Sequence, residues 1–497
     1  MLKTEVSNTQ KTVKGLFSQS FVTIALGIVE LLSFSIMSRL LTKQDFGYYA
    51  AIMAIVTVFS SFSETGIGAA IIQKQGIDKR FINNAFTLSL LLGGLISLLL
   101  FVLSGILSEN IADASMQTPL MLMSITLLLH CLTSVNVSLM YRKLQFYRVG
   151  FINLFASVAT TAIAIILAIN DLGYYAILSK AVLTSILVWG LTLHGVKYRY
   201  QFCADIQTLK SILSYSGWLM VSVVFRNLSQ QIDRLLMPKL FSVALLGAYN
   251  RPKDFIGQIS NKLNGIFDTV LFPVLSGIQN DKAKLSHSFR ESLYTINLFS
   301  TLLSLFFICN ANLLIRLFFG EQWINLAHVF QLFSASVMFN ADGRLADCYM
   351  RSIALTKQQF YFRILETFMK LVGVLTGAKW GLLGIATAVV LSDIMVKIIK
   401  ISFVAIRIEI PLKEVFSTLF SSWHFILFML PIGIPIYFLL CENTEKNIIL
   451  AILFFAFCGI LFLLFPASIG KKYKVKIHPH IIQTINQKVL HRSISKY

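Results

Sequence analysis

Charged side chains lie inside long apolar stretches of this 497-residue chain, which is 56% hydrophobic and only 13% charged. At the depth of a bilayer each such charge costs about 2.5–3.5 kcal/mol, so it normally faces protein or water. In the stretch 212–237, Arg226, Gln230 and Asp233 are spaced i, i+4 and i+7, which places them on one face of a helix. This spacing predicts a polar surface that either binds a charged ligand or pairs its own charges.

Basic residues are in surplus in this stretch and in the next one, which indicates an anionic ligand. Guanidinium groups donate forked hydrogen bonds that suit a phosphate or a diphosphate. The candidate residues for lining a substrate cleft are Arg226, Asp233, Arg234, Arg251, Lys253, Arg39 and Lys180. Two alternatives to a role in a cleft stay open. One is an ion pair between Arg226 and Asp233. The other is that Arg39 and Arg234 extend to the membrane interface.

Two acidic residues, Glu30 and Glu64, stand in the first two apolar stretches. A carboxyl group at this depth can titrate, so both are candidate coupling sites for H+ or Na+. The alternative is hydrogen bonding to neighbouring hydroxyl groups between packed helices. Three further pairs of opposite charge at i, i+4 favour structural ion pairs: Asp347/Arg351, Glu366/Lys370 and Asp393/Lys397.

The sequence carries no motif typical of a metal centre or an enzyme. The eight histidines and six cysteines show no ligand spacing, and the neighbours His130 and Cys131 fit a packed position better than a metal site. A phosphate-binding glycine loop, a nucleophile elbow and an HExxH motif are all missing from the sequence. We therefore predict no metal, no cofactor and no catalytic residue, and we do not expect an enzyme.

Apolar stretches return about fourteen times along the chain, and a helix of about 20 such residues spans the hydrocarbon core of a bilayer. The sequence therefore predicts an all-α integral membrane protein with about 14 transmembrane helices. The expected spans are 16–41, 46–72, 82–107, 117–140, 149–170, 172–194, 212–237, 241–277, 291–318, 323–354, 360–378, 381–406, 416–440 and 446–466.

Loop charges set the expected orientation. Alternate loops are rich in lysine and arginine, as the positive-inside rule describes. The basic ends include Lys11, Lys14, Lys74, Lys79, Arg80, Arg142, Lys143, Arg148, Lys197, Arg199, Lys282, Lys284, Lys357 and Lys471. Both termini are therefore expected in the cytoplasm. The net charge of +20 is spread over short loops and not over one face, which argues against nucleic acid as a partner.

The two halves of the chain resemble each other weakly, in the same order. The matching segments are Arg39–Leu41 and Phe46–Tyr49 with Arg234–Leu236 and Leu246–Tyr249, and Gly173–Ile186 with Gly381–Ile394. This order predicts two six-helix lobes in a parallel pseudo-repeat plus two C-terminal helices. The expected domains are a cytoplasmic segment 1–15, an N-terminal lobe 16–210, a C-terminal lobe 211–407, an extra helix pair 408–469 and a basic cytoplasmic tail 470–497.

Several segments carry a family resemblance. Ser38–Thr42 followed by Asp45–Gly47, then Glu64–Gln73, and Leu271–Ser276 followed by Ile278–Asp281 resemble motifs of the polysaccharide flippase branch of the multidrug/oligosaccharidyl-lipid/polysaccharide exporter superfamily. The resemblance implies two lobes around a central basic cleft and an optional C-terminal helix pair. It also implies transport of a polyprenyl-diphosphate-linked oligosaccharide without ATP hydrolysis, with H+ or Na+ coupling in some members. Glu64 departs from the motif, because aspartate is commoner there.

The resulting hypothesis is translocation of a lipid-linked oligosaccharide across a bacterial inner membrane, in polysaccharide or lipopolysaccharide biosynthesis. Its expected partners are that substrate, membrane lipids and glycan polymerase machinery. The same-class alternative is a cation-coupled multidrug exporter, which usually has twelve spans and an acidic cleft. A membrane glycan polymerase or ligase would need a large outside loop, and the predicted outside loops are at most about ten residues long. A non-transporting scaffold would leave the intramembrane charges without a role.

Overall fold

The computed structural model describes residues 22–63, 67–73, 76–266 and 271–420, and within these ranges the chain forms helices and short connections without any strand. This confirms the predicted all-α class. The elements in order are the helix Val22–Leu40, α2 (Lys43–Ser63), α3 (Ile67–Gln73), α4 (Lys79–Ile111), η1 (Ala114–Met116), α5 (Gln117–Arg142), α6 (Phe146–Ile169), α7 (Tyr174–Val196), α8 (Ile206–Leu240), α9 (Val243–Ile266), α10 (Phe272–Gly277), α11 (Lys282–Cys309), α12 (Ala311–Phe318), η3 (Glu321–Leu326), α13 (Ala327–Ser352), α14 (Thr356–Gly377), η4 (Ala378–Trp380), α15 (Gly381–Arg407) and a helix over 412–420.

Eight helical stretches in the described ranges are long and apolar enough to cross a membrane, with α14 and α15 counted as one. The chain is therefore a multi-pass membrane protein. Helices α8, α9 and α13 are absent from this set although they have 35, 24 and 26 residues. Even the shortest of these is about 36 Å long, so their more polar composition and not their length separates them from the apolar helices. The predicted span 446–466 and most of 416–440 lie outside the described residues, so the number of fourteen stays a prediction.

The chain divides into two compact units. The first unit contains the described residues of Met1–Ile259, Leu314–Phe333 and Leu355–Val396, and the second contains those of Ser260–Leu313, Ser334–Ala354 and Lys397–Tyr497. Helices α9, α12, α13 and α15 each contribute to both units. The lobes expected at 16–210 and 211–407 follow from the internal repeat, and they stay a prediction.

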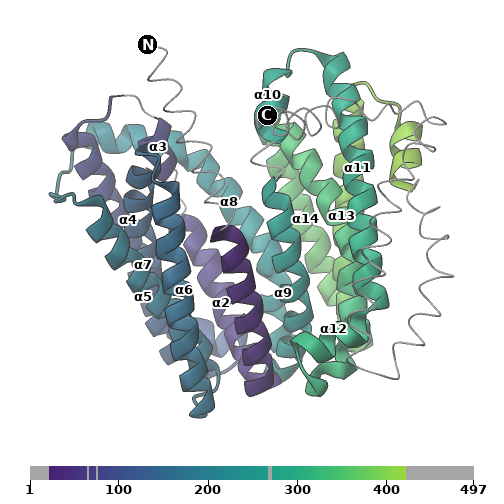
Figure 1. Ribbon diagram of the computed structural model, residues 1–497, viewed down its shortest axis with the longest axis horizontal. Coiled ribbons are helices and arrows are strands. Elements are labelled where there is room, and N and C mark those ends of the chain that lie inside the picture. Colours follow the sequence, from purple (N-terminus) through teal and green to yellow (C-terminus); the bar gives the residue numbers. More distant parts are fainter. Residues whose placement is uncertain (1–21, 64–66, 74–75, 267–270, 421–497) are drawn as a thin grey trace, which may run out of the picture. The chain divides into compact units, whose positions relative to one another are not determined.

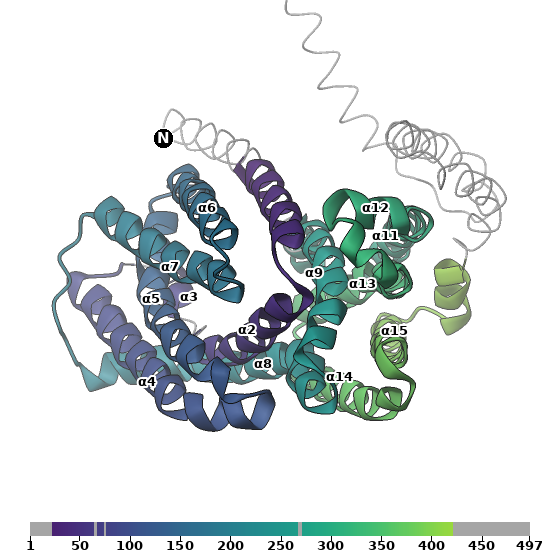
Figure 2. The same ribbon diagram turned by 90° about the horizontal axis from the view of Figure 1, so that it is seen from below.

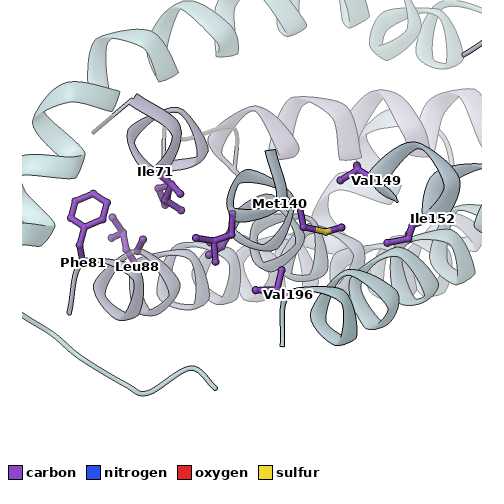
Figure 3. Packing of buried hydrophobic residues seen from close by; sticks show 11 residues of the cluster. Ile71, Phe81, Leu88, Met140, Val149, Ile152 and Val196 are labelled. Atoms are coloured by element: carbon purple, nitrogen blue, oxygen red, sulfur yellow. The ribbon is translucent and has the colours of Figure 1, made fainter. Parts of the chain in front are cut away.

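Apolar packing in the first unit joins α3, α4, α5, α6 and α7, of which α4 to α7 run side by side (Figure 1). Figure 3 shows part of this core, where Ile71 and Leu88 lie on one side of Met140 and Ile152 lies on the other. In a membrane, such helices associate through close packing, because lipid tails are as apolar as the side chains and burial from lipid provides no hydrophobic driving force. A Cβ atom at Gly93 of α4 would lie only 2.9 Å from Cys131 Cβ of α5, so glycine permits the close approach of these helices.

One end of the first unit brings together the predicted basic loops. Arg142 Nη1 donates a hydrogen bond to the carbonyl oxygen of Ile71 at 2.8 Å. Asp205 N donates to Asn84 Oδ1 at 2.8 Å, and Arg80 lies 3.6 Å from the Asp205 carboxylate. These contacts join the ends of α3, α4, α5 and the segment after α7, as the loop charges predict for one side of a membrane.

The opposite end holds the starts of α2 and α7 and the end of α4. Asp45 accepts a hydrogen bond from Tyr174 N at 3.0 Å, which places a carboxylate at the start of α7. Asp113, between α4 and η1, accepts from Tyr48 Oη at 2.6 Å and from Ser115 N at 2.9 Å. Burial alone would raise the pKa of Asp113, but hydrogen bonds from the Ser115 hydroxyl, from Tyr48 Oη and from Ser115 N outweigh burial and lower the pKa below its ordinary value.

Helices α2 and α9 cross at this same end through two glycines, and Figure 2 shows α2 beside α8 and α9. A Cβ atom at Gly47 would lie 1.8 Å from the carbonyl oxygen of Val243, and a Cβ atom at Gly247 would lie 1.9 Å from that of Lys43. The two glycines occupy matching positions in the repeat predicted from the sequence. Neither position has space for a side chain, so both are glycine for a steric reason.

The second unit is also held by polar contacts between helices. Asn297 of α11 donates to Asp342 Oδ2 of α13 at 2.6 Å, and Lys400 of α15 lies 3.0 Å from Asp347 Oδ1. Near the end of this unit, Arg290 lies 3.0 Å from the Glu414 carboxylate. The buried acids of α13 therefore have partners on neighbouring helices.

Candidate functional site

Four charged residues of α8 and α9 form two ion pairs side by side. Lys253 Nζ pairs with Asp233 Oδ2, which also accepts a hydrogen bond from Tyr249 Oη at 2.5 Å. Arg234 Nη2 lies 2.6 Å from Asp254 Oδ1. On α9, residues 249 and 253 are one turn apart and both reach Asp233, while residue 254 lies on the adjacent stripe and reaches Arg234. This group contains two acids and two bases and is electrically balanced.

A second balanced group joins α14 to α15. Lys370 Nζ lies 3.3 Å from Glu366 Oε1 on its own helix and 2.9 Å from Asp393 Oδ1 on α15. Arg363 Nη1 lies 2.9 Å from Glu366 Oε2. Lys370 is only 5% exposed, and both Asp233 and Lys253 act on it electrostatically. The two balanced groups are therefore neighbours inside the first unit.

Arg251 of α9 is a buried cation held by aromatic rings. Its guanidinium carbon lies 3.4 Å from the ring centre of Phe34 and 3.9 Å from that of Phe46. Its Nη2 donates to the carbonyl oxygen of Phe34 at 2.6 Å and to Ser38 Oγ at 2.7 Å. Within the described part of the chain, no carboxylate lies within ion-pair distance of this guanidinium. Arg251 therefore connects α9 to the helix Val22–Leu40 and to α2, and keeps a positive charge there.

Lys180 and Glu30 lie near this arginine. Lys180 Nζ of α7 donates to Ser33 Oγ at 2.8 Å. Both Glu30 and Arg251 act on Lys180 electrostatically. The structure thus brings together three of the residues singled out in the sequence, from the helix Val22–Leu40, α7 and α9.

Arg226 lies further along α8, where its Nε donates to Asn227 Oδ1 at 3.4 Å. Asn227 Nδ2 in turn donates to Ser61 Oγ of α2 at 2.8 Å. Asp233 pairs with Lys253 on the adjacent helix, which does not support the alternative that Arg226 bridges Asp233. Arg226 itself is half-buried.

Arg39 stands apart from this group. Arg39 is exposed, and its Nη2 donates to the carbonyl oxygens of Leu317 and Arg316 at 2.9 and 3.3 Å, so it lies at one end of the unit. Glu64 lies outside the described residues. Within the residues that were described, no group of three or more His, Cys, Asp and Glu side chains could hold a metal ion.

Glu366 and Lys370 form the predicted pair. Asp393, which the sequence predicts beside Lys397 on its own helix, also lies close to Lys370 from α15. The sequence analysis did not single out Tyr249 and Asp254, which complete the α8–α9 pairs. The i, i+4 spacing of Tyr249 and Lys253 was the signal in the sequence from which Tyr249 could have been identified.

The comparisons with known proteins identify one family and several distant relatives. The profile of a family described as "Polysaccharide biosynthesis protein" matches residues 36–328. The lipopolysaccharide biosynthesis protein WzxC of Escherichia coli (strain K12) is 22% identical over 391 residues, which cover 78% of this chain and 79% of that protein. The succinoglycan biosynthesis transport protein ExoT of Rhizobium meliloti (strain 1021) is 22% identical over 312 residues, which cover 62% of this chain and 60% of that protein.

Two solved structures share the fold. The lipid II flippase MurJ in an inward closed conformation superimposes with a TM-score of 0.68 at 16% identity, covering 92% of this chain and 99% of that one. An inward-facing multidrug resistance transporter of the MATE family superimposes with a TM-score of 0.62 at 14% identity, covering 77% of this chain and 94% of that one. Identities this low support a common architecture and nothing finer.

Proposed function

Because this chain belongs to the family of polysaccharide biosynthesis proteins, whose profile covers residues 36–328, we propose that it moves a polyprenyl-diphosphate-linked oligosaccharide from the cytoplasmic to the outer leaflet of a bacterial inner membrane. Relatives named for lipopolysaccharide biosynthesis and for succinoglycan transport support this substrate class. The fold shared with a lipid II flippase supports movement of a lipid-linked molecule. Both termini would face the cytoplasm, and glycan polymerase machinery would receive the product.

The observation that carries this proposal is the uneven charge of the first unit. The groups on α8–α9 and α14–α15 are balanced by their own ion pairs. Beyond them and the exposed Arg39, the described part of the unit contains the cleft candidates Arg226, Lys180 and Arg251 and the coupling candidate Glu30. A diphosphate diester carries about two negative charges, so this surplus matches an anionic head group.

The transport cycle we propose is alternating access between the two repeat-related halves of the chain. Matching glycines, Gly47 and Gly247, press α2 against α9 at one end of the first unit. Arg251 adds a second link between these halves, through Phe34 and Phe46. Separation of α2 from α9 at this crossing would open that end to the outside. The polyprenyl chain would stay in lipid throughout.

Charge reversal at Arg226 tests the proposal in cells. We expect Arg226→Glu to abolish surface-glycan export while Arg226→Lys retains it, at equal protein levels in the membrane. Lys357→Glu is the matched control, because Lys357 is exposed at the start of α14. Unchanged export in Arg226→Glu would remove this residue from the mechanism. Loss of export in the Lys357→Glu control would count against a charge effect specific to Arg226.

A second candidate function is cation-coupled drug export, which the fold shared with a MATE family transporter favours. A drug that is itself a cation would be repelled by the basic surplus described above. Expression of the protein in a drug-sensitive strain separates the two candidates. Raised resistance to cationic drugs would favour the exporter, whereas unchanged resistance with complemented glycan export would favour the flippase.

A further inference from the structure

The helix Val22–Leu40 ends because a backbone donor turns away from its last carbonyl groups. If the helix continued, the Ser38 carbonyl oxygen would accept from Thr42 N. Thr42 N donates instead to Asp45 Oδ2 at 3.0 Å, which starts α2. Ser38 is 0% exposed, so its carbonyl oxygen needs a donor from elsewhere in the protein.

Two side chains of η3 supply donors to this atom. Trp323 Nε1 donates to the Ser38 carbonyl oxygen at 2.8 Å, and Gln322 Nε2 donates to it at 2.6 Å. A carbonyl oxygen has two lone pairs, so these two donors satisfy it fully. Trp323 is 0% exposed, and its ring packs edge-on against Phe46 of α2, with the ring centres 5.6 Å apart. The segment η3 is therefore attached to the helix Val22–Leu40 and to α2 at the same place.

The same turn of the helix Val22–Leu40 is also held from α9. Arg251 Nη2 donates to the Phe34 carbonyl oxygen at 2.6 Å, and Arg251 Nε donates to Ser38 Oγ at 3.0 Å. A positive charge near the C-terminal end of a helix interacts favourably with the helix dipole. The end of this helix is thus bound by side chains from η3 and α9, at the end of the first unit where α2 and α9 cross.

The two η3 donors act on one atom, which makes their effects interdependent. Loss of one donor leaves the Ser38 carbonyl oxygen with the other, and an ordinary hydrogen bond corresponds to about a fivefold change in an equilibrium constant. Loss of both leaves a buried carbonyl group that only water can satisfy, and water reaches it only if the helix end moves away. The free-energy cost of losing both donors therefore exceeds the sum of the two single costs.

We propose that Gln322 and Trp323 form a latch that holds the helix Val22–Leu40 against η3 and keeps this end of the first unit closed. Release of the Ser38 carbonyl oxygen to water accompanies the opening of the α2–α9 crossing during transport, and renewed hydrogen bonding closes it. The role in transport rests on the proposed function, whereas the latch itself can be tested without any substrate.

The test is oxidation of buried methionines by hydroxyl radicals in the purified full-length protein, measured by mass spectrometry. Met37 precedes Ser38 and is 3% exposed, so its oxidation rate reports the entry of water at the latch. Met140 is 1% exposed in the core of α3 to α7 (Figure 3) and reports general loosening. Gln322→Ala is expected to raise Met37 oxidation about fivefold. Trp323→Phe keeps an aromatic ring but lacks the donor, and should raise it at least as much.

The double variant Gln322→Ala/Trp323→Phe is expected to raise Met37 oxidation by more than the product of the two single effects. Packing that is lost with the tryptophan is common to Trp323→Phe and the double variant, so it cancels in this comparison. Asn325→Ala removes an exposed side chain of the same element and should match the wild type. Met140 should oxidise at the wild-type rate in every variant.

Three results would overturn the latch. The first is unchanged Met37 oxidation in the double variant. The second is a double variant that equals the product of the single effects, which would mean that the donors act independently. The third is Met140 oxidation that rises in parallel with that of Met37, which would indicate general loosening.

Translocation of a lipid-linked oligosaccharide in liposomes tests the role of the latch in transport. The double variant is expected to translocate more slowly than either single variant, because the closed state is one of the two end states of the cycle. Translocation at the wild-type rate would remove the latch from the cycle. A wild type that does not translocate would contradict the proposed function, while the oxidation rates would still decide whether the latch exists.

Discussion

Replacement of Gly247 by alanine tests the α2–α9 crossing most sharply. The added Cβ atom would lie 1.9 Å from the carbonyl oxygen of Lys43 and 2.7 Å from Gly47 N. Ordinary contacts of this kind begin near 3.4 Å, so the helices would have to move apart by about 1.5 Å. Backbone atoms cannot rotate away as a side chain can, and we therefore place the strain at the upper end of the usual overpacking range of 1–3 kcal/mol.

Alanine also favours helix formation by up to about 1 kcal/mol relative to glycine, which offsets part of this strain. The expected net loss is about 2 kcal/mol, equivalent to a factor of about 30 in an equilibrium constant. Gly257→Ala is the matched control, because Gly257 lies in the same helix and a Cβ atom there would meet nothing within 4 Å. That variant should be as stable as the wild type or slightly more stable.

The assay is thermal unfolding of both purified variants beside the wild type, together with glycan export in cells. We expect Gly247→Ala to unfold at a lower temperature and to export less, and Gly257→Ala to do neither. A Gly247→Ala protein at least as stable as Gly257→Ala would refute the close crossing. Because Gly47 meets the carbonyl oxygen of Val243 at an equally short distance, Gly47→Ala should reproduce the loss.

Three further predictions concern the charged groups. Asp233→Asn leaves Lys253 buried without its acid and should lower the free energy of unfolding by about 3–5 kcal/mol. The double variant Asp233→Asn/Lys253→Gln should lower it by less. Thermal unfolding compares the two variants, and equal losses would contradict charge pairing. The pKa of Asp113 is lowered in the folded protein, so its stabilising effect is present above its ordinary value of 3.8 and is lost as the pH falls through the lower folded value. Asp113→Asn should therefore flatten the acid-side decline in unfolding temperature, and parallel curves for both proteins would reject this. Arg39→Ala should lose about 1 kcal/mol, from hydrogen bonds to two carbonyl groups, and keep full export; lost export at normal stability would place Arg39 on the substrate path.

Most of the described helices were predictable from the sequence, because bilayer thickness and loop charge act on each segment independently. Their ends were less so, since the predicted span 291–318 begins nine residues inside α11 and also contains α12. The basic loops near Arg80 and Arg142 do lie together at one end of the first unit. The ion pair Glu366–Lys370 was predictable for the same local reason, since i, i+4 spacing places the two side chains on one face.

Contacts between helices were not predictable in this way. Nothing in the residue spacing of α14 indicates that Asp393 of α15 forms an ion pair with Lys370. Likewise, the helical face that Arg226 and Asp233 share on α8 does not indicate that Asp233 pairs with Lys253 of α9. The repeat matched the segments around Gly47 and Gly247, but an alignment of two segments does not say whether they touch. Which helix packs beside which one is decided by the whole fold, and that information is absent from any single stretch.

The most direct test of the proposed function is translocation by the purified protein in liposomes. A polyprenyl-diphosphate-linked oligosaccharide would be placed in both leaflets, and its exposure to an impermeant glycan-cleaving enzyme would be followed over time. The account predicts that nearly all of the glycan becomes accessible with the wild type and only about half with Arg226→Glu, as in protein-free liposomes. Access limited to half with the wild type, under conditions where the protein is folded, would contradict it.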